Sequence, residues 1–131
     1  MKNHSMVLAL LTAMLPIGGF PQQTQAQQTD TYDYWAPQRI MVQRGQQAVF
    51  MCNGLFTGNR TLEQVFKQEL AFLREPVGTA EGGDYRVDWD LRAVEIGTAE
   101  NTPVMRAVFR DGIGCIILAP DQTLADIDDL P

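Results

Sequence analysis

The two cysteines, Cys52 and Cys115, constrain this 131-residue chain more than any other sequence feature. Cys52 lies in the stretch AVFMCNGLF, and Cys115 lies far downstream in RDGIGCIIL. An even number of cysteines in an exported chain predicts a disulfide bond, which here would tie an early element to the last strand. Closing such a loop stabilises a fold by about 4 kcal/mol in the chain-entropy model. Two alternatives remain: a pair of buried free thiols, and a nucleophilic Cys52 that would need an activating histidine.

The N-terminus has the pattern of a secretory signal peptide covering residues 1–26. A short basic start at Lys2 precedes an apolar run over residues 6–15, and Thr24-Gln25-Ala26 offers a small-residue cleavage site after Ala26. The apolar run is shorter than the about 20 residues that a membrane-spanning helix needs. We therefore expect a periplasmic or secreted protein with no membrane contact after signal cleavage.

The composition of the expected mature chain, residues 27–131, narrows its chemistry. Loss of Lys2 leaves 9 basic and 16 acidic residues, a net charge of −7. A nucleic-acid partner is not expected, because phosphate binding needs a basic surface. The only histidine, His4, and the only serine, Ser5, lie in the signal peptide. A Ser-His-Asp triad, histidine-based acid–base catalysis and histidine metal ligation are therefore excluded in the mature chain.

Two segments flank the part of the chain that has a regular pattern. Residues 27–45 have no clear hydrophobic period and predict an N-terminal arm. The arm would pack locally or on a missing neighbour through its aromatic residues Tyr32, Tyr34 and Trp35. Residues 119–131 are acidic and irregular, which predicts an interdomain linker or a wrapping segment, and the stop at Pro131 is expected to be a truncation.

The segment between these flanks, residues 46–118, predicts a small domain that begins with helices. Residues 46–56 are ambiguous between helix and strand, because short apolar runs do not reveal their period, but their spacing favours a short helix. Residues 61–73 have the clearest helical pattern, with Thr61 and Gln64 as a capping box at the N-terminus.

The second half of this domain alternates with a period of two and predicts strands. A hairpin is expected first, then a third and a fourth strand joined by the turn Asp111-Gly112; the four runs are residues 85–90, 93–99, 102–110 and 113–118. The predicted fold is therefore α+β. One or two helices pack on a three- to four-stranded, mostly antiparallel sheet, and the disulfide staples them together.

Three polar patterns have some features of ligand-binding sites, but each is more typical of surface or turn residues. Asp88 and Asp90 share one strand face, but no calcium-binding ligand spacing follows them. Arg106 and Arg110 with Asp111 are typical of surface ion pairs, and the Gly112-x-Gly114 pair lacks the rest of a dinucleotide loop. We therefore assign no catalytic, cofactor-binding or metal-binding residue from the sequence.

The stretches FMCNGLFTGNRTLEQVF, VDWDLRAVEI and MRAVFRDGIGCIIL follow one another between residues 48 and 118. Together they resemble the N-terminal segment of secreted serine hydrolases in the β-lactamase and penicillin-binding-protein superfamily. Those proteins have a Cys-x-Gly-x-Phe element before an Arg and a helix, and a short sheet that ends in an Arg-x-Gly-x-Gly-Cys strand. The matching positions are Cys52, Gly54, Phe56, Arg60, Arg110, Gly112, Gly114 and Cys115.

This resemblance implies a non-catalytic N-terminal domain of a periplasmic or secreted serine hydrolase, whose partner is the catalytic domain of the same protein. The family's Ser-x-x-Lys nucleophile motif and its Tyr or Ser general-base motif are absent here, so no catalytic residue transfers to this chain. Two alternatives stay open. One is a complete small secreted binding domain without catalytic activity, and the other is an enzyme that uses two converging carboxylates with a displaced pKa.

Overall fold

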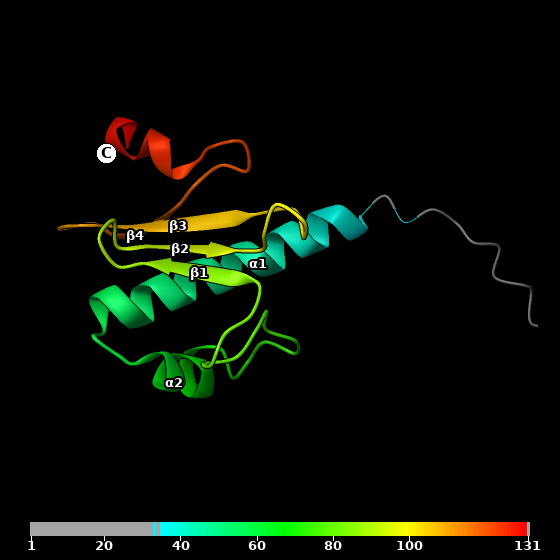
Figure 1. Cartoon of the computed structure of the whole chain (residues 1–131), viewed down its shortest axis with the longest axis horizontal. Helices are drawn as coiled ribbons and strands as arrows, with labels where there is room; N and C mark the ends of the chain where they lie inside the picture. Colours follow the sequence, from blue (N-terminus) through cyan, green and yellow to red (C-terminus); the bar gives the residue numbers. More distant parts are fainter. Residues whose placement is uncertain (1–32, 34, 131) are drawn as a thin grey trace, which may run out of the picture. The chain divides into compact units, whose positions relative to one another are not determined.

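A computed structural model describes Asp33 and residues 35–130 of the chain. The predicted signal peptide, its cleavage site after Ala26 and the first part of the predicted arm lie outside the described residues. The described part has the predicted α+β fold, in which helices pack on a four-stranded antiparallel sheet (Figure 1).

The first helix, α1 (Ala36–Cys52), crosses one face of the sheet and continues as a π-helical turn, η1 (Asn53–Thr57) (Figure 1). Pro37 stands in its first turn, where a missing backbone N–H costs nothing. The prediction of an arm over residues 27–45 is wrong for residues 36–45, which are helical. The apolar period is weak because the face of α1 that turns inward buries polar Arg44 and Gln47 together with Ala48 and Met51.

The second helical segment consists of α2 (Leu62–Gln64) followed by the π-helical turn η2 (Val65–Glu69). The predicted capping box is present: the Gln64 backbone N–H donates to Thr61 Oγ1 at 3.2 Å, and the Thr61 N–H donates to Gln64 Oε1 at 3.0 Å. The helix ends at Leu70, earlier than the predicted residue 73, because the Leu70 N–H bonds back to the Val65 carbonyl and the chain then turns.

The sheet contains β1 (Tyr85–Asp88), β2 (Ala93–Ile96), β3 (Met105–Arg110) and β4 (Gly114–Ile117) in the order β1-β2-β3-β4. Every neighbouring pair is antiparallel, so the four predicted strands and the hairpin connections are confirmed with shorter bounds. The main core lies between this sheet and the helices, and its fully buried apolar members are Ala48, Met51, Cys52, Val65, Val94, Ile96 and Ala107.

The predicted disulfide joins Cys52, the last residue of α1, to Cys115 in β4, with 6.0 Å between the Cα atoms. Cys52 is completely buried in the main core. The bond spans 63 residues of sequence and fastens the end of the helix to an edge strand of the sheet. It therefore holds the helical layer and the sheet in a fixed register.

The C-terminal segment covers the opposite face of the sheet and ends in a 3-10 helix, η3 (Leu124–Asp129) (Figure 1). Ile127 is buried there against Ala93, Val108 and Leu118, which form a second small core. A capping box between Thr123 and Asp126 begins the helix. Of the two interpretations of residues 119–131, the wrapping segment describes the observed structure.

Candidate functional site

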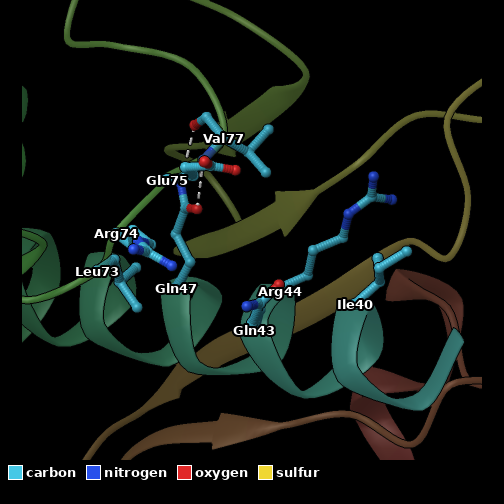
Figure 2. A pocket seen from close by; sticks show the side chains of 8 residues that line it. All are labelled: Ile40, Gln43, Arg44, Gln47, Leu73, Arg74, Glu75 and Val77. Atoms are coloured by element: carbon cyan, nitrogen blue, oxygen red, sulfur yellow. Dashed lines mark hydrogen bonds between the residues drawn. The ribbon is translucent and has the colours of Figure 1, made fainter. Parts of the chain in front are cut away.

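A cavity of about 200 Å³ lies beside α1 and is the first candidate for a ligand site. Its walls come from the helix and from the loop that precedes the sheet (Figure 2), and its lining residues are Ile40, Gln43, Arg44, Gln47, Leu73, Arg74, Glu75 and Val77. Whether it can bind a ligand depends on the polar groups that remain available to a guest, since a binding site needs a few placed donors or acceptors.

Both polar groups of the Gln47 side chain are hydrogen-bonded to the loop at Val77. Its Nε2 donates to the Val77 carbonyl at 2.8 Å, and its Oε1 accepts from the Val77 N–H at 2.7 Å (Figure 2). The side chain is 2% exposed, so it occupies both backbone groups of Val77 much as a neighbouring strand would. The amide of Gln47 therefore fixes the loop and is not available to a ligand.

Arg44 is 8% exposed and holds the connection between β2 and β3. Its Nη1 donates to the carbonyl oxygens of Asn101 at 2.5 Å and Pro103 at 2.6 Å, and its Nη2 donates to Asn101 Oδ1 at 2.6 Å. Asn101 Nδ2 in turn donates to Asp84 Oδ2 at 2.6 Å. A side chain on Gly97, which has φ +98°, would lie 2.7 Å from Arg44 Nη1.

Figure 2 shows the guanidinium of Arg44 directed away from Glu75 and Val77, so mainly its stem faces the cavity. Among the described residues, no buried side-chain nitrogen or oxygen lacks a hydrogen-bond partner. The buried polar groups beside the cavity are thus committed to the fold. We call Arg44, Gln47, Val77, Asn101 and Pro103 the polar end of the domain, and we assign it a structural role.

The sequence did not single out Arg44 or Gln47. Both share a helical stripe with Ala48 and Met51, three to four residues apart, so their position on the buried face was the available signal. A polar residue on such a stripe is ordinarily taken as the solvent face. The structure shows instead that these two side chains replace apolar packing with hydrogen bonds to distant loops.

A row of ion pairs crosses three strands on the face of the sheet that the C-terminal segment covers. Glu95 Oε2 accepts from Arg86 Nε at 2.7 Å, and Glu95 Oε1 accepts from Arg106 Nε at 2.7 Å. These three residues face one another across β1, β2 and β3 in the strand register. The sequence indicated surface ion pairs of Arg106 and Arg110 with Asp111. This prediction is wrong for Arg106, because the strand register places Arg106 opposite Glu95.

Asp111 pairs with Arg92 across the two hairpin turns, with contacts of 3.0 Å and 2.7 Å between their oxygens and guanidinium nitrogens. This bond from Arg92 lowers the pKa of the Asp111 carboxyl below its usual value. The Arg92 guanidinium also lies 4.5 Å from the centre of the Phe109 ring. Because consecutive antiparallel strands reverse direction, the turns after β1 and β3 lie at the same end of the sheet.

Large apolar side chains are exposed at this end of the sheet. Trp89 packs edge-on against Phe56 with 5.6 Å between ring centres, yet remains largely exposed, as do Leu91 and Ile113. A shallow hollow of about 320 Å³ opens between the turns and is lined by Arg92, Phe109, Arg110, Asp111 and Ile113. We call this region the hairpin end and define it by Phe56, Trp89, Leu91, Arg92, Asp111 and Ile113.

Asp88 and Asp90 were expected to share one strand face, but β1 ends at Asp88 and Asp90 lies in the turn that follows. Asp88 Oδ1 accepts the Leu91 N–H at 3.0 Å and thereby closes the turn after β1, while Asp90 is exposed in that turn. Within the described residues, no group of three or more His, Cys, Asp or Glu side chains is placed to hold a metal ion. The carboxylates that the sequence singled out therefore act in local structure.

Two of the positions that carry the resemblance to serine hydrolases, Cys52 and Cys115, form the disulfide, and the others make local contacts. A side chain on Gly54 would lie 2.7 Å from Val65 Cγ2, so this glycine permits the close approach of η1 and η2. Arg60 pairs with Glu69 at 2.5 Å and donates to Gln68. Gly112 and Gly114 have φ values of +78° and +94°, which favour glycine in the turn and at the start of β4. The contacts of these four positions are structural.

Comparison of the chain with protein-family models, with curated proteins and with solved structures finds no match. In the part of the chain that the structure describes, none of the helices has the length and hydropathy to cross a membrane.

Proposed function

We propose that this chain is a non-catalytic N-terminal domain of a periplasmic or secreted serine hydrolase of the β-lactamase and penicillin-binding-protein type. Its partner is the catalytic domain of the same protein. The observation that carries the proposal is the convergence of the two matching segments, which are distant in sequence, on the Cys52–Cys115 bond. This bond joins the two stretches of sequence that carry the resemblance.

The roles of the matching residues also agree with a supporting domain. They provide the disulfide, a close contact at Gly54, an ion pair at Arg60 and two glycine turns, all of which specify shape. Disulfides persist in oxidising compartments, which supports export. The nucleophilic serine of such a hydrolase has to come from another part of the protein, because Ser5 is the only serine here.

The test is made on the native product purified from its source through an antibody against this domain. The product is treated with a fluorophosphonate, which reacts covalently with activated serines, and its mass is measured with and without reductant. We expect a polypeptide much larger than this chain, labelled on a serine outside these 131 residues. A product with the mass of residues 27–131 and no co-purifying labelled hydrolase would refute the proposal.

A second candidate is a small secreted binding domain without catalytic activity. The exposed Trp89 and Ile113 at the hairpin end favour it, because aromatic and large apolar residues are enriched in binding hot spots. The same purification separates the two functions. A small unlabelled product that captures a stable partner supports the binding domain, and a labelled large product supports the hydrolase.

A further inference from the structure

The hairpin end has the composition of a buried interface although it faces solvent in this structure. Trp89, Leu91 and Ile113 are 59%, 46% and 60% exposed. Beside them lies the paired Arg92 and Asp111. Interface centres are enriched in tryptophan and arginine and tend to be surrounded by polar contacts. The turns themselves are held in place by the ion pair and by the Phe56–Trp89 ring contact, so the surface is preorganised.

The last described residues lie beside Arg110, which also lines the hollow at the hairpin end. The Arg110 side chain donates from Nη2 to the carbonyl oxygen of Leu130 at 3.2 Å. Figure 1 shows η3 running over the sheet toward the end at which the hairpin turns lie. Under the proposed function, the polypeptide that leads into the catalytic domain thus starts near Arg110.

We propose that the hairpin end is the surface on which the catalytic domain of the same polypeptide docks, an inference that rests on the proposed function. A domain tethered beside a surface meets it at a high effective concentration, so a modest apolar contact suffices for docking. Trp89 and Ile113 are the expected anchors. The exposed apolar residues at the start of α1, Trp35 and Val42, adjoin none of the matching positions and are not expected to be covered by that domain.

The two tryptophans of the chain provide an internal comparison. Trp35 and Trp89 are 70% and 59% exposed, so an uncovered domain presents both to solvent to a similar degree. Hydroxyl-radical footprinting of the intact native product, read by mass spectrometry, compares their oxidation rates in one sample. We expect Trp89 to be oxidised about tenfold more slowly than Trp35, since interface centres pack as densely as protein interiors. Ile113 is compared with Val42 in the same way.

The result separates this inference from the proposed function. A large, fluorophosphonate-labelled product in which Trp89 and Trp35 are oxidised at equal rates overturns the docking surface and leaves the hydrolase proposal standing. A product without a labelled serine overturns both, because the occupant is then absent. Protection of Trp89 in a labelled product supports the inference.

A pair of variants of the whole protein tests the cause of the protection. The double variant Trp89→Ser with Ile113→Ser is expected to be cleaved by a protease about tenfold faster within the connecting chain that follows residue 131, because undocking exposes that chain. The matched control, Trp35→Ser with Val42→Ser, removes equally exposed apolar groups and is expected to leave that rate unchanged. Equal rates in both double variants would overturn the docking surface.

Discussion

The two ends of the sheet are built in opposite ways. At the polar end, buried Arg44 and Gln47 donate or accept hydrogen bonds to backbone groups of the connecting loops. At the hairpin end, the disulfide lies within the core and the loops display Trp89, Leu91 and Ile113 to solvent. The difference is that buried hydrogen bonds fix the loops of one end, whereas the loops of the other end hold exposed apolar side chains.

The energetic basis of the two ends differs as well. A buried hydrogen bond contributes little net free energy when made, but leaving its partner without a bond costs more. The polar end therefore depends on every one of its members being present. The hairpin end depends on a covalent bond and on ring contacts that tolerate exposure. Substitutions at each end test this contrast.

The largest effect is expected from removing the staple with Cys52→Ala and Cys115→Ala together. Loss of a bond across 63 residues lowers the free energy of unfolding by about 4 kcal/mol in the chain-entropy model. The melting temperature of a domain of this size should fall by about 20 °C. Calorimetry of the oxidised protein, the reduced protein and the double variant measures it. Reduced wild type and double variant should agree, and a melting curve that neither change moves would refute the staple.

The second effect is the loss of the buried guanidinium in Arg44→Met. Two carbonyl oxygens and the Asn101 side chain lose their donor, which lowers the free energy of unfolding by about 3 kcal/mol. Urea denaturation measures it. Arg39→Met on the same helix is the matched control, because Arg39 is exposed and pairs with Asp33 at the surface; it should cost under about 1 kcal/mol. Equal costs for both variants would show that the polar end is not held by Arg44.

The third effect is the loss of the two hydrogen bonds by which the Gln47 side chain holds the loop at Val77. Gln47→Leu keeps the approximate volume but removes both bonds to Val77, so the free energy of unfolding should fall by about 1.5 kcal/mol. Proteolysis within the loop that contains Val77 should become faster. Gln46→Leu changes the exposed neighbour and should stay within about 0.5 kcal/mol of the native protein. A loop that is cleaved no faster in Gln47→Leu would contradict this role of Gln47.

The sheet and the disulfide could be predicted because their signals are local. Alternation with a period of two, the Asp111-Gly112 turn and an even cysteine count each have one simple structural explanation. The start of α1 could not be predicted, because Arg44 and Gln47 occupy its buried face and erase the apolar period. The C-terminal segment was also ambiguous, because among the side chains of η3 that the structure describes Ile127 alone is a buried apolar one, and one residue makes no pattern.

The candidate site was harder to predict than the fold, for a related reason. Arg92 and Asp111 stand in different turns, and only the strand register brings them together. The sequence placed Asp111 with its neighbours Arg106 and Arg110, since proximity in the chain was the available guide. Register decided the partners instead, as it did for Glu95 and Arg106.

The smallest effect is a pH dependence confined to the hairpin end. Hydrogen bonding and charge from Arg92 lower the pKa of Asp111 below 3.8, its unfolded value. A carboxyl with a lowered folded pKa stabilises the fold above the unfolded value and loses that contribution as the pH falls through the folded pKa. The effect is small because both side chains are in water. The oxygens that Arg44 bonds at the polar end are neutral amides, and the carboxylate of that network is Asp84, which accepts from Asn101 Nδ2.

A double-mutant cycle with Arg92→Gln and Asp111→Asn isolates this pair, because the lowered pKa values of Asp33, Glu81 and Asp126 also add to the acid limb of the whole protein. Urea denaturation of the four proteins at pH 6 should give a small favourable coupling between residues 92 and 111. Repeated at a pH below the lowered pKa of Asp111 in the folded protein, the coupling should vanish. A coupling that is equal at both pH values would mean that the two turns are joined by packing around Phe109 rather than by charge.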